Sequence, residues 1–436
     1  MANTILFLQG PASPFLKKVA DNLQSKGWEV HKLNFCIGDA VMWWPKSADR
    51  FSKPTADWPA FLKQYILDRG VTDIAMLGDG RSRHAEALRV GRHLGLRIHV
   101  FEHGYLRPDW LMIETRGPSE QNRGLSGSLT VSHINAPDTG TRSITRSIYY
   151  QSFLVSSLYD LAFHLPNVFF GQLIHPHYRT HGPVHPLWEY AGWVRKGLLR
   201  KSRVRQARAL QARYLDDGPD YFLFALQLVG DYQILNHAPA GDLYGIVNGT
   251  IRSFARSAPS HCRLLLKIHP LDNGLHNWSR HIAAESGKYG IEDRVDVIDG
   301  GDLEALIDKS LGVVTVNSTV GVTALLAQKP VLALGRAIYD QQGLTHQASI
   351  DDFWINPPAP DTGLPEALAD RLIEVTHFRG GFIGKPAMEA GGRNLAERIH
   401  ANAMKTTQDV FPVTSSFRYE NALFNPPEFQ AGPFSV

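Results

Sequence analysis

Short apolar and β-branched runs alternate along the chain with segments of helical length, and this alternation limits the possible folds more than any other feature. The runs predicted as strands are 4–8, 28–35, 72–79, 97–102, 221–227, 263–268, 295–298, 313–316 and 330–334. Helical apolar spacing occurs at 15–26, 82–94, 148–170, 244–256 and 303–309. Strands and helices that alternate at these lengths are typical of βαβ units around parallel sheets.

The βαβ units fall into two groups, and 436 residues are too many for one ordinary core. We therefore expect an α/β protein with two Rossmann-like domains that face each other across a cleft, which is the GT-B arrangement. The predicted divisions are an N-terminal Rossmann-like domain at 1–150, a helical and basic connecting segment at 151–215, a C-terminal Rossmann-like domain at 216–390, and a C-terminal helix and tail at 391–436 that pack back on the surface. Residues 117–145 are rich in Gly, Ser, Thr and Asn, so they are predicted to form a long surface loop.

The overall composition excludes several classes of protein. The formal net charge is only +3, which argues against nucleic acid as the main partner. Cys36 and Cys262 are the only cysteines, so there is no disulfide framework and no CxxC zinc pattern, and a reducing compartment fits. The first residues have no basic segment and only a short apolar run, so we do not expect a signal peptide.

The most apolar window, 152–174, is interrupted by Asp160, His164 and Pro166. We therefore expect no spanning helix there, and the protein is predicted to be cytoplasmic, with the possibility of lying against a membrane. Cations cluster just beyond this window, with Trp193, Leu198 and Leu199 among them: Arg195, Lys196, Arg200, Lys201, Arg203, Arg205 and Arg208. Such a run forms either a solvated helix face or a surface for anionic lipid headgroups.

A cluster of short polar side chains follows the predicted strand at 313–316. Asn317, Ser318 and Thr319 stand where a helix would begin, and the first turn of a helix offers unpaired N–H groups to an anion. We expect the Ser318 and Thr319 hydroxyls to add donors and Gly321 to let a ligand approach the backbone. The alternative is that the three residues before Gly321 serve only as N-caps.

A second candidate anion site follows the predicted strand at 263–268. Lys267 and His269 are two residues apart, so their side chains emerge on the same side of the strand end, beside the turn at Pro270. A cation and an imidazole suit a phosphate, although His269 could instead be a capping or structural histidine. Turns after neighbouring parallel strands open at one edge of a sheet, so the two sites together predict a nucleotide site. The chain has no P-loop, no GxGxxG after the first strand and no DxD pair, so nothing in the sequence calls for a metal at the diphosphate.

Two carboxylates stand at predicted strand ends that face the cleft. Asp231 follows the strand at 221–227, and Glu102 ends the strand at 97–102. Gln227, at the end of the first of these strands, is a further candidate for the nucleotide site. Carboxylates on opposite sides of a sugar suit glycosyl transfer through an oxocarbenium-like state. Asp231 could equally be a turn-forming residue, and which of the two would be nucleophile or base is open.

Polar residues at strand ends of the first domain are candidates for contacts with an acceptor or a sugar, because ligands of parallel sheets bind there. They are Asp79, Arg81, His103, Tyr105 and Arg107. The histidines at 175–185 have no clean metal spacing, so a loop of stacked and hydrogen-bonded imidazoles is favoured over a zinc site. No metal ligand and no cofactor is predicted.

Five motifs, taken in order, resemble a known family. They are FEHGYLRPDW at 101–110, LQLVGDYQI at 226–234, KIHPLD at 267–272, VNSTVG at 316–321, and LGRAIYDQQGLTHQ at 334–347 with DDFW at 351–354. Together, over about 70–355, they are similar to the capsule polysaccharide biosynthesis/export family of the KpsS–LipB type. The resemblance implies a GT-B retaining β-Kdo transferase that moves Kdo from CMP-Kdo to a phosphatidylglycerol-type lipid. It also implies a cytoplasmic protein, peripheral at the inner membrane, that works with capsule assembly and export proteins.

The same resemblance implies roles for individual residues. His269 and Pro270 match a nucleotide-binding motif that contacts the CMP phosphate, Ser318 and Thr319 match a hydroxyl motif on the same phosphate, and Asp231 matches the carboxylate expected to be the nucleophile. His103 departs from the acidic residue expected after Glu102. Two other functions stay open: a non-catalytic scaffold for capsule export, and a nucleotide-sugar epimerase with the same two-domain architecture.

Overall fold

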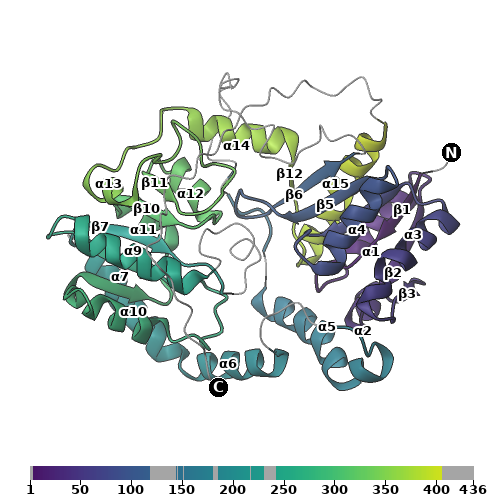
Figure 1. Cartoon of the computed structure of the whole chain (residues 1–436), viewed down its shortest axis with the longest axis horizontal. Coiled ribbons are helices and arrows are strands. Elements are labelled where there is room, and N and C mark those ends of the chain that lie inside the picture. The colour runs from purple at the N-terminus through teal and green to yellow at the C-terminus, as the bar shows by residue number, and fades with distance from the viewer. Residues whose placement is uncertain are drawn as a thin grey trace.

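The computed structural model describes residues 3–117, 144, 146–150, 152–179, 185–216, 218–229 and 242–404. The predicted catalytic residue Asp231, most of the predicted loop at 117–145 and the tail after 404 lie outside the described residues. Figure 1 shows two α/β lobes joined at the middle of the molecule. One contains a seven-stranded sheet and the other a five-stranded sheet, which confirms the predicted α/β class with two Rossmann-like parts.

The first lobe is built from the N-terminal third of the chain. Its strands are β1 Thr4–Phe7, β2 Glu29–Asn34, β3 Asp49–Arg50, β4 Asp73–Leu77, β5 Arg97–His103 and β6 Trp110–Arg116. Its helices are α1 Phe15–Gln24, α2 Ile37–Trp43, α3 Trp58–Arg69 and α4 Ser82–His93, with a 3-10 turn at Thr55–Asp57. Strands β1 to β5 pair in parallel, whereas β6 runs antiparallel to β5. The carboxyl ends of β1, β4 and β5 therefore lie at one edge.

The second lobe is entirely parallel. Its strands are β7 Tyr221–Ala225, β8 Arg263–Lys267, β9 Val295–Ile298, β10 Gly312–Thr315 and β11 Val331–Ala333. Its helices are α9 Leu243–Ser257, α10 Trp278–Gly287, α11 Leu303–Lys309, α12 Val320–Leu326, α13 Ile350–Ile355 and α14 Leu364–Val375, with a 3-10 turn at Glu292–Arg294. The strand order is β11-β10-β7-β8-β9, and every pair is parallel. Apolar side chains fill both faces of this sheet, as expected for strands covered by helices on both sides.

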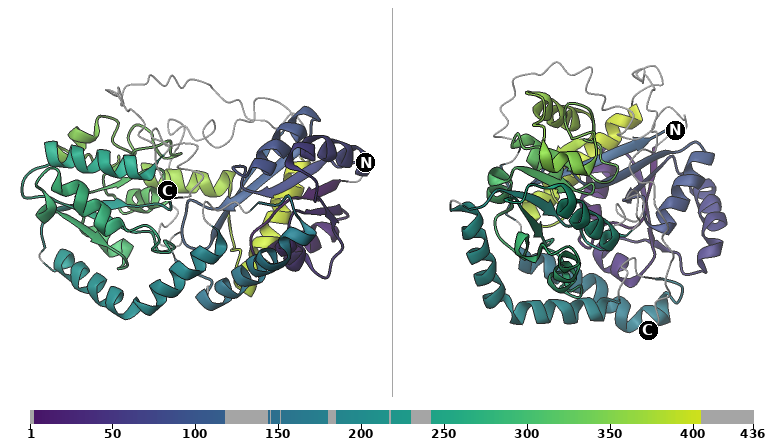
Figure 2. Two further views of the ribbon diagram at one scale, coloured as in Figure 1. Left: turned by 60° about the horizontal axis from the view of Figure 1, so that its bottom comes forward. Right: turned by 60° about the vertical axis from the view of Figure 1, so that its left-hand side comes forward.

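Three helices link the lobes along one side of the molecule: α5 Phe153–Ile174, α6 Pro186–Leu198 and α7 Arg200–Leu215 (Figures 1 and 2). Helix α5 packs against α2 of the first lobe, and α7 packs against α11 and β9 of the second. By length and composition alone, α5 is apolar enough to cross a membrane. The helix predicted at 148–170 is confirmed, and it continues through Asp160, His164 and Pro166.

After α14 the chain returns to the first lobe. Strand β12 His377–Arg379 pairs antiparallel with β6, and α15 Lys385–Met404 packs along α1. The return thus begins before residue 377, and the predicted boundary at 390 is too late. A side chain at Gly391 would meet Phe15 and Leu111, so glycine lets α15 lie close to the first sheet.

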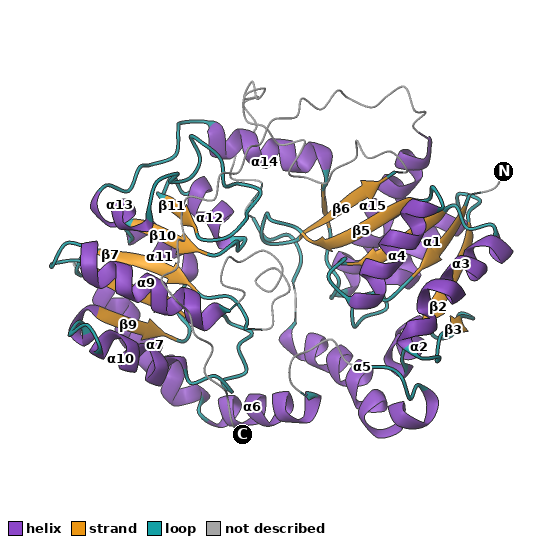
Figure 3. Cartoon of the chain, viewed as in Figure 1, coloured by secondary structure: helices purple, strands orange, loops and turns teal. Residues whose placement is uncertain are grey.

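The two lobes share part of one apolar core. Leu106, Trp110 and Met112 of the first lobe belong to the same buried cluster as Tyr339 and Leu344 of the second. The segment between β5 and β6 therefore reaches into the second lobe, as the central crossing in Figure 3 shows. The strand ends of both lobes are held near one another by this contact.

Candidate functional site

The second lobe brings three of the predicted loops to one edge of its sheet. Strands β10, β7 and β8 are adjacent and parallel, so the segments after them begin at the same edge. Gln227, after β7, donates through Nε2 to Asn317 Oδ1 at 3.0 Å, and its Oε1 accepts from the Asn317 backbone N–H at 3.1 Å. The predicted residues Gln227 and Asn317 are thus paired with each other, and this pair fixes the start of the Ser318 turn beside the end of β7.

Ser318 and Thr319 form the turn that leads into α12. The Ser318 backbone N–H donates to Thr315 Oγ1 at 3.2 Å, and the Ser318 hydroxyl accepts from the Val320 N–H at 3.3 Å. Both side chains are half-buried. Within the described part of the chain, the Thr319 hydroxyl has no hydrogen-bond partner, and Thr319 gives α12 no side-chain cap. The Thr319 side chain therefore does not serve as an N-cap of α12, whereas the Ser318 hydroxyl caps the Val320 N–H in the first turn of this helix.

The predicted role of Gly321 is wrong. A side chain at this position would lie 2.4 Å from the ring of Tyr339, so glycine makes room for that ring. The buried Tyr339 hydroxyl then donates to the Ser318 carbonyl at 2.6 Å. Tyr339 thereby supports the turn from behind, and the space over Gly321 is filled by protein.

The loop after β8 carries the other predicted residues. His269 is half-buried, Pro270 is exposed, and His269 Nδ1 accepts from the Leu271 N–H at 3.1 Å. With Nδ1 as the acceptor, the neutral imidazole carries its proton on Nε2. The arrangement suits a hydrogen bond to an anion.

Lys267 lies deeper than the sequence predicts. Its Nζ donates to the Gly300 carbonyl at 2.5 Å, and burial lowers the pKa of Lys267 while Asp299 and Asp302 oppose that shift. The ammonium therefore joins the loop after β9 to the end of β8. Lys267 therefore holds the carboxyl end of β8 in place, and the half-buried His269 ring is closer to the protein surface than the buried Lys267 ammonium.

In the first lobe, the candidates around β4 are bound to other protein groups. Asp79 Oδ2 and Arg116 Nη1 are 2.9 Å apart, and Arg81 Nη1 donates to Gln9 Oε1 at 2.9 Å. Glu102 lies against Gly78, where a side chain would come within 2.8 Å of Glu102 Oε1. The positive φ of Gly78, 65°, also favours glycine. The structure thus brings Glu102 and the 78–81 turn together at one strand edge.

Gln9 extends this arrangement into the protein interior. Its Nε2 donates to Asp39 Oδ2 and to the Tyr178 hydroxyl, each at 3.3 Å. Burial raises the pKa of the nearby Cys36 thiol, which therefore stays protonated at neutral pH and is a poor nucleophile. This buried network connects the end of β1 to the segment after α5.

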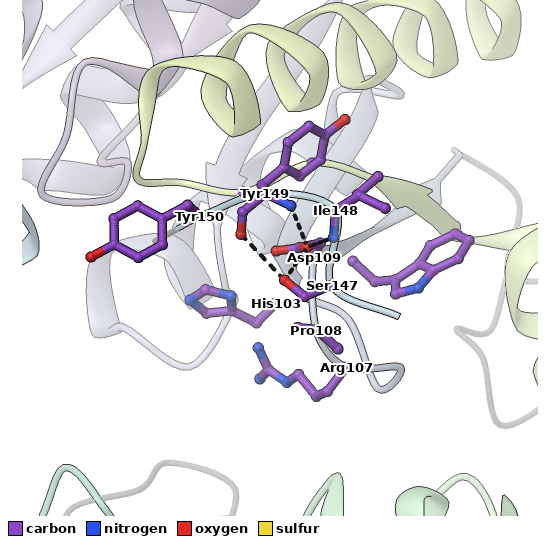
Figure 4. Close-up of a pocket in the computed structure, with 11 residues that line it drawn as sticks. His103, Arg107, Pro108, Asp109, Ser147, Ile148, Tyr149 and Tyr150 are labelled. Atoms are coloured by element: carbon purple, nitrogen blue, oxygen red, sulfur yellow. Dashed lines mark hydrogen bonds between the residues drawn. The ribbon is translucent and has the colours of Figure 1, made fainter. Parts of the chain in front are cut away.

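A cavity of about 580 Å³ opens where β5, β6 and the β12–α15 connection meet. His103 and Arg107, both predicted, are among the residues that line it (Figure 4). Arg107 forms no ion pair or hydrogen bond with the described residues, so its guanidinium is available to an anion. The surrounding protein lowers the pKa of Arg107, and burial together with the charge of Arg107 lowers the pKa of His103. His103 is therefore neutral at pH 7, and one fixed cation faces the cavity.

The segment from Gly104 to Trp110 is held by residues that the sequence did not single out. Tyr105 donates its backbone N–H to His377 Nε2 at 2.7 Å, so Tyr105 is positioned by β12. The Asp109 carboxylate accepts from the N–H groups of Ile148 and Tyr149 at 2.7 and 2.9 Å. The Arg379 guanidinium stacks 4.1 Å from the centre of the Trp110 ring. The FEHGYLRPDW motif contains Asp109 and Trp110, so the sequence held a signal for these two residues. His377 and Arg379 are more than 250 residues further along the chain, and no sequence pattern connects them to this segment.

Metal ligands are not gathered anywhere in the described ranges: no group of three or more His, Cys, Asp and Glu side chains could hold an ion. His175 and His177 of the predicted histidine loop are described, and Tyr178 beside them joins the Gln9 network.

In the basic segment, Arg195 and Lys196 donate to the carbonyls of Gly274 and Asp272, and Arg203 pairs with Asp299. These three cations therefore bind groups of the second lobe, although Arg195 stays exposed to solvent.

Comparisons with known proteins agree on the family. The model described as "Capsule polysaccharide biosynthesis protein" matches residues 72–383. The chain is 30% identical over 381 residues to the capsule polysaccharide export protein KpsS of Escherichia coli, covering 85% of this chain and 94% of that protein. It is 28% identical over 399 residues to the capsule polysaccharide modification protein LipB of Neisseria meningitidis serogroup A, covering 87% and 92%.

A solved structure, the β-Kdo 2,7 transferase of Thermosulfurimonas dismutans KpsC, is similar over 91% of this chain and 99% of that one, with 12% identity and a TM-score of 0.42. The sequence relationships carry the assignment, because the family model spans well over half of the 436 residues. This chain belongs to the capsule polysaccharide biosynthesis protein family.

Proposed function

We propose that the protein is a retaining glycosyltransferase that moves Kdo from CMP-Kdo to a phosphatidylglycerol-type lipid, forming a β-Kdo linker. One observation carries the proposal: in the strand order β10-β7-β8, the Ser318–Thr319 turn and the His269–Pro270 corner flank the end of β7. Neighbouring strands are about 4.8 Å apart, so β10 and β8, on either side of β7, are roughly 10 Å apart, and side chains from the two loops can reach one anion between them. Membership in the capsule biosynthesis family supports the substrate class.

In this proposal the donor's phosphate lies at the edge of the second lobe. His269 Nε2–H and the Ser318 and Thr319 hydroxyls donate to the phosphate oxygens, with Pro270 shaping the corner. Gln227 and Asn317 hold the turn through their mutual hydrogen bonds, and Lys267 supports the loop through Gly300. The leaving group is already an anion of low basicity, so hydrogen-bond donors replace strong acid catalysis and no metal is required.

Retention of configuration calls for two displacements. A carboxylate, Asp231 in our preferred assignment, attacks the anomeric carbon as its bond to the CMP phosphate oxygen breaks. The acceptor hydroxyl then attacks the same carbon, releases the carboxylate and gives its proton to a base, for which Glu102 is the candidate. Asp231 follows β7 in sequence and Glu102 is the last residue but one of β5, so the two would approach the sugar from opposite lobes.

The acceptor is proposed to bind at the cavity of the first lobe. Arg107 would pair with the lipid phosphate and neutral His103 would donate or accept a hydrogen bond beside it. Tyr105 contributes shape, because its backbone is fixed by His377. Asp79 and Arg81 are engaged with Arg116 and Gln9, so we assign them a supporting part. The reaction would then take place at the cytoplasmic side of the inner membrane, beside capsule assembly and export proteins.

The deciding experiment incubates the purified protein with CMP-Kdo and phosphatidylglycerol vesicles, and compares it with Asp231→Asn. The proposal expects a glycolipid product and CMP release from the first protein and neither from the second. A scaffold for export would show no saturable CMP binding, and an epimerase would change the sugar without an acceptor. Normal turnover by Asp231→Asn would remove the nucleophile assignment, and the absence of any product with CMP-Kdo would overturn the reaction.

A further inference from the structure

One face of α5 carries an apolar stripe that the described chain covers only in part, since its members Leu161 and Leu165 are half-buried and the others are exposed. Leu154, Leu158, Leu161, Leu165 and Phe169 recur at spacings of three and four residues, which places them in one row along the helix. Leu154 and Phe169 are each 67% exposed and Leu158 is 56% exposed, whereas Phe163 is the helix's only fully buried residue. A row of this length on a protein surface marks an interaction site.

The opposite face of α5 is fixed to the first lobe. A side chain at Gly38 of α2 would lie 2.4 Å from the Phe163 carbonyl, so the two helices approach closely. The Gly38 N–H also donates to Asn167 Oδ1 at 3.1 Å. A helix held in this way cannot cross a bilayer without leaving the lobe, so its exposed stripe can only lie on a surface.

Helix α6 continues the exposed apolar surface beside α5. Leu187, Val194 and Leu198 recur at spacings of seven and four residues, and all three are exposed. The Tyr190 hydroxyl donates to Asp160 Oδ2 at 3.0 Å, so α6 contacts α5 at this point. Figures 1 and 2 show both helices along the same outer side of the molecule. Exposed Trp188 on α6 adds a residue type that prefers the lipid–water boundary.

Positive charge lies immediately after this apolar surface. Arg200, Lys201, Arg205 and Arg208 of α7 are exposed and make no ion pair with any described residue. They differ in this from Arg195, Lys196 and Arg203, which bind the second lobe. An apolar face flanked by free cations complements a surface of acyl chains and anionic headgroups.

We infer that the α5–α6 face, defined by the two apolar rows above, docks in the plane of an anionic phospholipid bilayer, with the four free cations of α7 against the headgroups. The start of α5 lies close to the acceptor cavity in the chain, because the exposed residues Ile148 and Tyr150, which line that cavity, come just before this helix. Docking would therefore present the cavity, with Arg107, to a lipid still seated in the membrane. This last link rests on the proposed function, whereas the docking itself does not.

Flotation of the full-length protein with vesicles tests the docking without substrate or turnover. Binding to phosphatidylcholine vesicles that contain phosphatidylglycerol is expected, with weaker binding to pure phosphatidylcholine and in high salt. Leu158→Glu and Phe169→Glu should each reduce binding about tenfold or more, from the loss of apolar burial. Arg200→Gln and Lys201→Gln should each reduce it about fivefold. The matched controls, Ile355→Glu on α13 and Arg92→Gln on α4, should bind like the unchanged protein.

A probe at the stripe gives an independent readout. Cys36 and Cys262 are buried, so a dye on Leu158→Cys reports that position, and its emission should shift to the blue with phosphatidylglycerol vesicles. Three results would overturn the inference: unchanged flotation of the α5 variants, resistance to extraction by alkaline carbonate as for a spanning helix, or a dimer that Leu158→Glu dissociates without changing vesicle binding. CMP binding is measured on the same α5 variants. A variant that loses vesicle binding but keeps CMP binding is impaired at this face and not at the proposed donor site.

Discussion

Gln227 and Asn317 bind each other through two hydrogen bonds at the carboxyl edge of the second sheet, at 3.0 and 3.1 Å. Both side chains are buried, and they connect the ends of β7 and β10. Because truncating one partner leaves buried polar groups unpaired, Gln227→Ala should lower the free energy of unfolding by about 1–3 kcal/mol.

The double variant Gln227→Ala/Asn317→Ala distinguishes a coupled pair from two separate contributions. Its cost should be smaller than the sum of the single variants, measured by denaturant unfolding, since the second substitution removes a group that has already lost its bond to the first. Additive costs would contradict the pairing and leave the Ser318 turn without its link to β7.

His269 should contribute to CMP affinity through its Nε2–H. A hydrogen bond to a charged phosphate contributes about 1.5–3 kcal/mol, so His269→Ala should weaken CMP binding roughly 10- to 100-fold in titration calorimetry. His261→Ala is the matched control, because His261 lies just before the opposite end of β8. Equal losses in the two variants, or none in His269→Ala, would exclude the proposed contact.

Arg107 should act on the acceptor and not on the donor. Arg107→Ala is expected to raise the KM for phosphatidylglycerol and to leave CMP affinity unchanged, with Arg107→Lys intermediate because lysine keeps the charge but loses the forked geometry. Arg92→Ala, an exposed arginine of α4, is the control. The assignment fails if CMP binding falls in parallel with transfer.

His377 should make the stability of the protein depend on pH. Burial lowers the pKa of His377 to about 3, and its neutral Nε2 accepts from the Tyr105 N–H. Above about pH 6.5 the imidazole is neutral in both the folded and the unfolded chain, whereas below it only the unfolded chain takes up the proton. The stability from this group is therefore complete above about pH 6.5 and is lost as the pH falls toward 3.

His377→Gln keeps an acceptor for Tyr105 but cannot titrate. Between pH 7.5 and pH 5 the unchanged protein should lose about 2 kcal/mol more unfolding free energy than this variant. Denaturant unfolding at several pH values measures the difference. Parallel pH profiles would show that His377 is not held neutral, and would question the attachment of the Gly104–Trp110 segment to β12.

Much of the fold could be predicted because each strand of a βαβ unit is a local apolar run. The strand 295–298 and the helix 303–309 match the structure residue for residue, and most others differ by one or two residues at each end. Strand β6, which pairs locally with β5, was missed, and so was β12, whose antiparallel pairing with β6 joins residues more than 250 positions apart. The same long-range pairing explains why the return to the first lobe was placed too late.

The site was predictable in its position and less so in its contacts. Strand ends locate Gln227, His269 and Ser318 at one edge because parallel strands share a direction. Nothing local shows that Gln227 would bind Asn317 or that Tyr339 would fill the space over Gly321. Asp231 lies outside the described residues, and its role stays a prediction.

A crystal structure of the protein with CMP tests the central claim most directly. The account predicts the phosphate between the two loops, within hydrogen-bonding distance, about 3 Å, of His269 Nε2 and of a Ser318 or Thr319 hydroxyl. A phosphate bound at another place, or contact with only one of these two loops, would contradict it.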